Sequence, residues 1–560
     1  MGGGLRPLRE IVEAVLQGQV KTPADLEKRK RQAASELGLS SLPSNADILA
    51  QALPEERDRL KLLVRKPTRT LSGVAVIAAM TSPARCPHGI CVPCPGGIRA
   101  LASSPQSYTG QEPAALRAGQ HGYDPYRQVH ARLRQLEEIG HPVDKAELII
   151  MGGTITSRPL GYQQWFVKRC LQAMNDYPLT DPLPSDPSPS GQGLASHLPS
   201  RPSLSECSLS GHQPSPQPVR DPPASGPSGW QSFREAAELN QRARVRNVGM
   251  TFETRPDWCR PGHIQSMLSL GATKVELGVQ SIRDEILAGI RSGHDRAATV
   301  DANRNLREAG LKVGFHMMPG LPGSSPSRDL EEFRELFQSP DFRPDYLKIY
   351  PTLVVEGTEL YDLYRRGEYI PLGDEEAAEL ISRVKEIIPP YTRLQRVQRD
   401  IPARLIVAGV KKSNLRQLAE ERLRAREGRC RCIRCREAGL QGVSPGQAKL
   451  QVESYEACGA QEHFISYLSG QDVLVGFLRL RLGEKARVRE LHVYGPLIPL
   501  GRRGGWQHQG YGAGLLQAAE EMAVLAGYRS IEVTSAIGVR DYYRRLGYRI
   551  ALPYVVKDLA

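Results

Sequence analysis

The chain has 560 residues, of which 40% are hydrophobic and 24% charged, and 74 Lys and Arg against 61 Asp and Glu give a net charge of +13. This length allows several domains, while no run approaches the ~18 consecutive apolar residues of a membrane-spanning helix. We therefore expect no membrane association. Because a signal-peptide core is also missing, the sequence predicts a cytoplasmic protein with reduced cysteines, and its positive charge favours a polyanionic partner.

Residues 1–65 form the first predicted region. Apolar residues spaced by three and four, as in LREIVEAVLQG, predict helices, and the run KRKRQ makes the region basic. We expect a helical, basic N-terminal region.

Residues 66–405 alternate between short apolar runs and amphipathic segments. GVAVIAAM and AELIIMGGT are typical of buried strands, and YRQVHARLRQLEEIG between them is typical of a helix. About six such units predict an α/β fold, a partial or complete parallel barrel whose functional groups lie at the C-terminal ends of the strands. The pattern is broken at residues 180–230, where 12 Pro and 12 Ser fall within positions 181–230. This composition predicts a disordered insertion in a surface loop.

Three cysteines, Cys86, Cys91 and Cys94, lie in the loop RCPHGICVPCPGG after the first predicted strand. Three thiolates from one Pro- and Gly-rich loop favour an iron–sulfur cluster with one open iron. A structural zinc normally takes four ligands, and only His88 is near in sequence. Zinc and simple core packing remain the alternatives.

This loop resembles that of the radical S-adenosylmethionine enzymes. Together with TFETRPDWC, HMMPGLPG and LKIYPTLVVEGTELY, it resembles more narrowly the family of the catalytic subunit of Elongator, of bacterial or archaeal type. The resemblance runs from about residue 60 to the end, apart from the insertion. It implies a radical S-adenosylmethionine barrel with a [4Fe-4S] cluster bound by the three cysteines. Four residues at strand ends would contact S-adenosylmethionine: Gly152, Gly153, Glu253 and Glu276. For the two glutamates, an ion pair with Arg255 or Lys274 is an equal alternative.

The sequence pattern changes at residues 451–560. Here successive segments typical of antiparallel strands precede the loop QHQGYGAG and a predicted helix. Glycines at a helix N-terminus suit a pyrophosphate. The arrangement resembles the GNAT acetyltransferase domain, an α+β fold that binds acetyl-CoA. The resemblance assigns acetyl-CoA contacts to the backbone groups of Glu490, Leu491, His492 and Val493. Further contacts are assigned to Gln507, Gly510, Tyr511, Gly512, Ala513 and, from the barrel, Lys145. Tyr543 would protonate a leaving thiolate, with its neighbour Tyr542 as a catalytic candidate or a packing residue.

A second cysteine cluster, Cys430, Cys432 and Cys435, lies in a basic connector at residues 406–450. Its spacing predicts structural zinc, and a second iron–sulfur cluster is the alternative. Cys458 is the tentative fourth ligand, ahead of His463.

A radical generator and an acetyl donor site in one chain imply a combined reaction. The resemblance implies an acyltransferase and radical enzyme that forms 5-carboxymethyluridine at the wobble uridine 34 of tRNA from acetyl-CoA. It would need an electron donor and would act as a monomer or homodimer. The alternatives are a protein lysine N-acetyltransferase of the histone type with a structural radical domain, or a non-catalytic RNA-binding scaffold. Basic side chains favour phosphate contacts with the anticodon stem-loop; the candidates are Arg31, Lys66, Arg69, Lys411, Lys412, Arg431 and Arg434.

Overall fold

The computed structural model describes residues 6–65, 70, 73–97, 104–178, 228–441, 447–470, 472–494 and 510–559. Gln507, Lys66, Arg69 and nearly all of the predicted insertion therefore lie outside the described residues. Among the helices that are described, none combines the length and the apolar character needed to cross a membrane.

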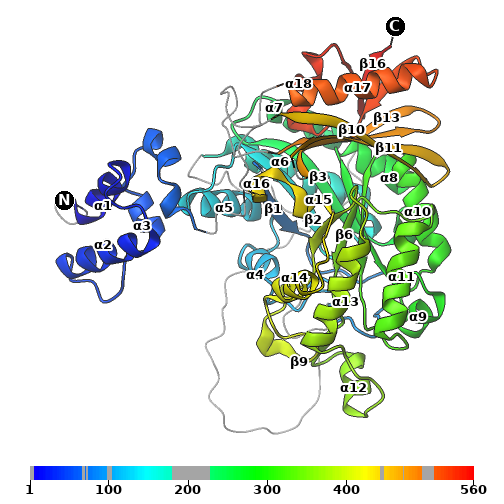
Figure 1. Cartoon of the computed structure of the whole chain (residues 1–560), viewed down its shortest axis with the longest axis horizontal. Helices are drawn as coiled ribbons and strands as arrows, with labels where there is room; N and C mark the ends of the chain where they lie inside the picture. Colours follow the sequence, from blue (N-terminus) through cyan, green and yellow to red (C-terminus); the bar gives the residue numbers. More distant parts are fainter. Residues whose placement is uncertain are drawn as a thin grey trace.

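The N-terminal region is a small helical unit with its own apolar core. Its helices are α1 (Arg6–Leu16), α2 (Pro23–Glu36) and α3 (Asn45–Leu49). Thr22 and Ser44 begin α2 and α3 as capping residues, each accepting a hydrogen bond from a backbone N–H of the first turn. Leu8, Val12 and Ile48 meet in the core. The unit projects from the main body (Figure 1).

The central part of the chain forms one sheet of parallel strands in the order β1-β2-β3-β4-β5-β6-β8. Its strands are β1 (Ala75–Met80), β2 (Lys145–Met151), β3 (Arg246–Thr254), β4 (Lys274–Gln280), β5 (Lys312–Met317), β6 (Tyr346–Ile349) and β8 (Arg393–Arg396). The first and last strands do not pair with each other, so the barrel is partial. This confirms the predicted parallel half-barrel.

Helices lie around this sheet, and α12 lies apart from it near β9 (Figure 1). They are α4 (Pro113–Gln120), α5 (Pro125–Glu138), α6 (Leu160–Asp176), α7 (Ser228–Asn240), α8 (Pro261–Ser269), α9 (Asp284–Gly289), α10 (Arg296–Glu308), α11 (Pro326–Gln338), α12 (Glu359–Arg365) and α13 (Asp374–Ile387). Apolar side chains of strands and helices share one large core, in which Phe166, Phe252 and Phe315 are fully buried. A short ladder joins β7 (Val354–Val355) to β9 (Ile406–Ala408).

The connector and the C-terminal domain follow. The connector contains α14 (Leu415–Ala425), α15 (Ile433–Arg436) and α16 (Ala438–Gln441). The second sheet has the order β10-β11-β12-β13-β14-β16-β15. Its strands are β10 (Ala448–Ala457), β11 (Ala460–Ser469), β12 (Val473–Leu482), β13 (Ala486–Val493), β14 (Ser530–Val533), β15 (Arg549–Ala551) and β16 (Tyr554–Asp558). The helices α17 (Tyr511–Leu525) and α18 (Arg540–Arg544) complete the domain.

The C-terminal domain packs against the half-barrel at the end where the strands of the half-barrel begin. Asp345, just before β6, accepts hydrogen bonds from Arg489 of β13 at 2.6 and 2.8 Å. Arg307 of α10 contacts Glu462 of β11 at 3.1 Å. These four side chains have at most 1% exposure, so the domains meet through a buried ionic network. Buried charges of this kind need complete pairing to be tolerated.

Candidate functional site

The first cysteine loop lies at the opposite end of the half-barrel, directly after β1. Gln106 holds the loop: its side chain accepts from the Cys86 backbone N–H and donates to the Gly89 carbonyl at 2.8 Å. The backbone N–H of Ser107 donates to Cys94 Sγ at 3.3 Å. Burial raises the pKa of Cys86 and raises that of Cys91 to about 12.

The sulfur spacing differs between the two cysteine clusters. The sulfurs of Cys430, Cys432 and Cys435 all lie within 4.8 Å of one another, whereas among the described residues the first loop forms no such group. Sulfurs bound to one tetrahedral zinc lie about 3.8 Å apart, given Zn–S bonds of about 2.3 Å. In a [4Fe-4S] cluster, three cysteines bind three different irons and therefore stand farther apart. The first loop fits a cluster and the second fits a single metal ion.

Two glycines at the end of β2 border the first loop. A Cβ on Gly152 would lie 2.3 Å from Thr81 Oγ1, and one on Gly153 would lie 3.9 Å from Cys86 Sγ. Their φ angles of 127° and 79° also favour glycine. The backbone thus stays bare beside the cysteine sulfur, as a cofactor contact requires.

The two predicted glutamates lie on the concave face of the half-barrel and are already paired. Glu276 contacts Lys274 at 3.2 Å, His316 at 3.0 Å and Lys348. Burial alone would raise the pKa of Glu276, but Lys348 and Lys274 hold it well below the usual range. The ion pair with Lys274 named as the alternative is therefore present. Glu253 is less enclosed and contacts Lys348 at 3.1 Å.

These pairs extend into what we call the polar path: Glu253, Lys348, Glu276, Lys274 and Tyr346. It starts near the cysteine loop, where Tyr108 donates to Glu253 at 2.9 Å. It ends at the C-terminal domain: Lys274 Nζ lies 4.7 Å from the centre of the Tyr346 ring, and the Tyr346 hydroxyl donates to Glu490 of β13. Gly314 permits this packing, because a Cβ there would approach Glu276 Cγ to 3.0 Å. The polar path connects the two ends of the half-barrel.

In the C-terminal domain, β13 and β14 pair as parallel strands only from Ala486 to Val488. Beyond Val488 the ladder stops, and the register of β13 on β12 shifts at Arg489. The two strands therefore separate just where the predicted contacts Glu490, Leu491, His492 and Val493 lie. Gly510, with φ of 89°, begins α17 next to this gap. Tyr511, Gly512 and Ala513 form the first turn of the helix.

Tyr542 and Tyr543 occupy different environments. A Cβ on Gly512 would lie 2.7 Å from the Tyr542 hydroxyl, so this hydroxyl lies at the first turn of α17. Tyr543 is buried in the domain core, with its ring edge-on to that of Tyr548 at 5.8 Å. Burial raises the pKa of both phenols. The geometry thus favours Tyr542 over the predicted Tyr543 as the tyrosine that faces a ligand at the helix N-terminus.

Lys145 is the first residue of β2 and pairs in register with Arg246 of β3. Because Gly538 of the C-terminal domain packs against the Arg246 side chain, Lys145 lies at the end of the barrel that faces this domain. Burial lowers the pKa of Lys145. This is the side from which a lysine would reach coenzyme A.

Cys458, the tentative fourth ligand, does not form one close group with the second cysteine trio. Its sulfur accepts from Asn303 at 3.2 Å and lies 3.5 Å from the Asp341 carbonyl, so it belongs to the interface between the domains. His463 instead contacts Ser454 at 2.7 Å. Near the second trio, the ammonium of Lys385 lies 3.5 Å from Cys435 Sγ and 3.0 Å from Glu420.

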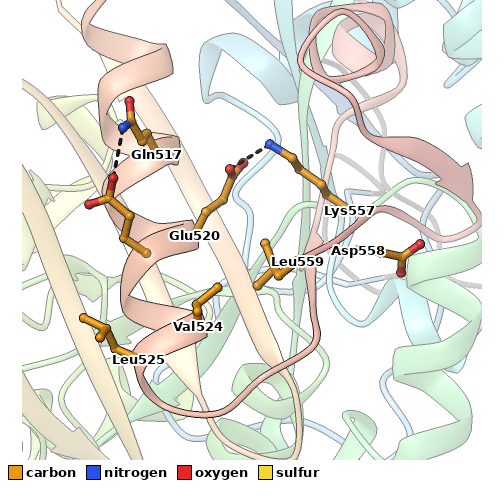
Figure 2. Close-up of a pocket in the computed structure, with 8 residues that line it drawn as sticks. Gln517, Glu520, Val524, Leu525, Lys557, Asp558 and Leu559 are labelled. Atoms are coloured by element: carbon orange, nitrogen blue, oxygen red, sulfur yellow. Dashed lines mark hydrogen bonds and ion pairs between the residues drawn. The ribbon is translucent and has the colours of Figure 1, made fainter.

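Sequence reasoning named Lys274 only as an ion-pair partner and missed Lys348 and His316 as parts of the site. Their signal was a charge at alternate positions of strands that are otherwise apolar, as in KVELG and YLKIY. A groove elsewhere, between α17 and β16, contains none of the predicted residues (Figure 2). It is lined by Gln517, Glu520, Glu521, Val524, Leu525, Lys557, Asp558 and Leu559.

Comparison with known proteins gives three family matches. Residues 5–71 match the ELP3 N-terminal domain, residues 199–337 the radical SAM superfamily and residues 344–425 the radical SAM C-terminal domain. The chain is 44% identical to a tRNA uridine(34) acetyltransferase of Methanocaldococcus infernus, over 99% of both chains. It is 38% identical to Elongator complex protein 3 of Homo sapiens, over 99% of this chain and 96% of the other.

A solved structure agrees with these matches. The archaeal Methanocaldococcus infernus Elp3 with an N-terminal deletion is 41% identical, covers 87% of this chain and 100% of its own length, and superposes with a TM-score of 0.69. Full-length similarity at this level, together with the matches to the ELP3 N-terminal domain and the radical SAM superfamily, shows that the chain belongs to the Elongator complex protein 3 family of radical S-adenosylmethionine proteins.

Proposed function

We propose that the protein modifies uridine 34 of tRNA and forms 5-carboxymethyluridine from acetyl-CoA. The names of the relatives support tRNA uridine 34 as the target. The observation that carries the proposal is the polar path, since it joins the cysteine loop to the strand β13 at which an acetyl group would arrive. The two halves of the reaction would then be joined by one chain of polar contacts.

The cysteine loop fits a [4Fe-4S] cluster, and Cys86, Cys91 and Cys94 would hold it. With S-adenosylmethionine bound, such a cluster supplies a 5′-deoxyadenosyl radical. The backbone at Gly152 and Gly153 leaves room for this ligand beside Cys86. Glu253 is the better candidate for a direct contact, because Glu276 is saturated by two lysines and a histidine.

The C-terminal domain fits acetyl-CoA in the gap between β13 and β14. Gly510 and the first turn of α17 offer backbone N–H groups to a pyrophosphate. The side chains of Glu490 and His492 alternate with Leu491 and Val493 along β13, and the latter pair packs toward α17. The acetyl group would therefore leave the gap on the side of the half-barrel. Tyr542 would donate a proton to the departing thiolate.

The basic connector supports an RNA partner. Arg431, a predicted phosphate contact, is exposed and contacts Asp472 at 3.2 Å, so its charge is partly balanced. Lys412 pairs with Glu375 at 3.0 Å. Arg31 is exposed on α2. These groups act as a patch rather than as single sites, and binding should weaken as salt rises.

The direct test is anaerobic incubation of the reconstituted protein with tRNA, S-adenosylmethionine, acetyl-CoA and a reductant, followed by mass spectrometry of uridine 34. We expect a mass gain corresponding to one carboxymethyl group, dependent on every component. Acetylation of lysine side chains in added protein, with uridine 34 unchanged, would support the acetyltransferase alternative and refute the proposal.

We also propose that Cys430, Cys432 and Cys435 bind structural zinc. Replacing Cys432 with Ser should lower the zinc content from about one ion per chain to near zero, because a tetrahedral site does not survive the loss of a thiolate. Cys458→Ser is the matched control and should retain zinc. The measurement is inductively coupled plasma mass spectrometry, and equal zinc in both variants would contradict the assignment.

A further inference from the structure

The side chain of His492 lies at the end of the half-barrel where its strands begin, close to Lys312 and Arg393, and has no role so far beyond the predicted contact of its backbone with acetyl-CoA. It lies on β13, two residues from Glu490 and two from Tyr494. Glu490 accepts from Tyr346 of β6, and Tyr494 accepts from Arg393 of β8 at 2.9 Å. All three side chains therefore point from the C-terminal domain toward the concave face of the half-barrel.

The imidazole of His492 has an unmatched polar atom. Its Nε2 is buried and has no hydrogen-bond partner, although its ring packs against Tyr494 at 4.4 Å and Phe477 at 6.2 Å. Leaving such an atom unpaired costs about 1–3 kcal/mol. The residue as a whole is only partly buried, while its Nε2 is enclosed at the contact between β13 and the half-barrel.

Of Glu490 and His492, only His492 has a basic atom without a hydrogen-bond partner. Glu490 is held by Tyr346 and by Arg479 at 2.9 Å, and its pKa is lowered. Burial lowers the pKa of His492 to about 4, so its imidazole is neutral at pH 7. The other charged groups that act on it are Arg393, Lys312 and Glu147.

We propose that His492 is the general base for hydrolysis of the thioester, after the acetyl carbon has become attached to the uracil ring. This proposal rests on the proposed function. Nε2 of His492 takes a proton from a water molecule, and the hydroxide adds to the thioester carbonyl carbon. The tetrahedral intermediate collapses with cleavage of the carbon–sulfur bond. Carboxylate forms on the nucleoside, and the coenzyme A thiolate leaves and is protonated.

Lys312 is placed to assist this step. It is the first residue of β5, on the same face as Lys274, with which it pairs in register. Its ammonium makes no ion pair within the described residues, and the nearby carboxylates Glu490 and Glu147 oppose the lowering of its pKa by burial. A cation here would stabilise the oxyanion of the tetrahedral intermediate.

The test compares His492→Gln with the matched control His263→Gln on α8. Three quantities are measured: acetyl-CoA affinity by calorimetry, 5′-deoxyadenosine formation with tRNA, and carboxymethyluridine formation. We expect the variant to keep the first two within about twofold, while carboxymethyluridine formation falls about 100-fold or more. Mass spectrometry should then detect coenzyme A joined through its thioester to uridine 34. The control should retain all three.

Imidazole separates a catalytic from a structural role. His492→Ala should regain part of its carboxymethyluridine formation when imidazole is added, because the small base fits the vacated space. Formation of carboxymethyluridine by His492→Gln at the wild-type rate would overturn the proposal for His492 alone. Absence of tRNA-dependent 5′-deoxyadenosine in the wild-type protein would instead refute the proposed function, and the His492 step with it.

Discussion

Cys86→Ala should abolish both 5′-deoxyadenosine formation and the modification of uridine 34, while acetyl-CoA binding is unchanged. The reason is that Cys86 lies beside Gly153 in a loop whose three sulfurs do not all lie within 4.8 Å of one another, which fits a cluster better than one ion. Losing one thiolate removes the ligand set of the [4Fe-4S] cluster. Iron analysis after anaerobic reconstitution should fall from about four irons per chain toward zero.

Cys170→Ala is the control for this experiment. Cys170 is fully buried in the core of the half-barrel, far in sequence from the loop. This variant should keep its iron and its activity, with only a modest loss of stability from the smaller side chain. If Cys86→Ala kept iron and modified tRNA at the wild-type rate, the first cysteine loop would not be the radical centre.

Asp345→Ala should destabilise the protein by about 3–5 kcal/mol, the cost of removing one partner from a buried ion pair. Asp345 is fully buried and faces three arginines: Arg489 at 2.6 Å, Arg479 at 3.4 Å and Arg307 at 3.6 Å. Without the carboxylate, these cations would remain buried at the domain interface with too little negative charge. Urea denaturation followed by circular dichroism measures the change in unfolding free energy.

The control is Asp400→Ala, which removes an exposed pair with Arg396 and should cost less than ~1 kcal/mol. The effect of Asp345 also has a defined pH dependence. Burial would raise the pKa of Asp345, but the arginines hold it below its usual value. Its stabilising contribution is therefore present above pH ~4 and declines as the pH falls below that value. Equal destabilisation by both variants at pH 7 would contradict this account of the interface.

The half-barrel could be predicted from the sequence because its strands are continuous apolar runs separated by amphipathic helices. The cysteine loop could be placed because it follows such a run. The polar path could not be predicted, because Lys348 and Glu276 are 72 positions apart in the sequence. Nothing in the local sequence distinguishes either residue from any other charged residue in a strand. Register across the sheet, rather than local pattern, brings these groups together.

The C-terminal site shows the same limit. The glycine turn before α17 is visible in the sequence, but the choice between Tyr542 and Tyr543 depends on which side of a short helix faces the gap. The position of Cys458 could not be predicted, because cysteine spacing does not reveal partners in space; its sulfur contacts Asn303 at the domain interface. In each of these cases, the position of the side chain depends on contacts between residues that are far apart in the sequence.

The measurement that tests the account most directly uses acetyl-CoA deuterated on the acetyl methyl group. Chemistry that starts at the cysteine loop and acts on a thioester held by β13 must remove a hydrogen from that methyl group. We therefore expect deuterium in the 5′-deoxyadenosine that accumulates with tRNA, detected by mass spectrometry. Unlabelled 5′-deoxyadenosine, formed while uridine 34 is modified, would show that the two sites do not act on the same molecule.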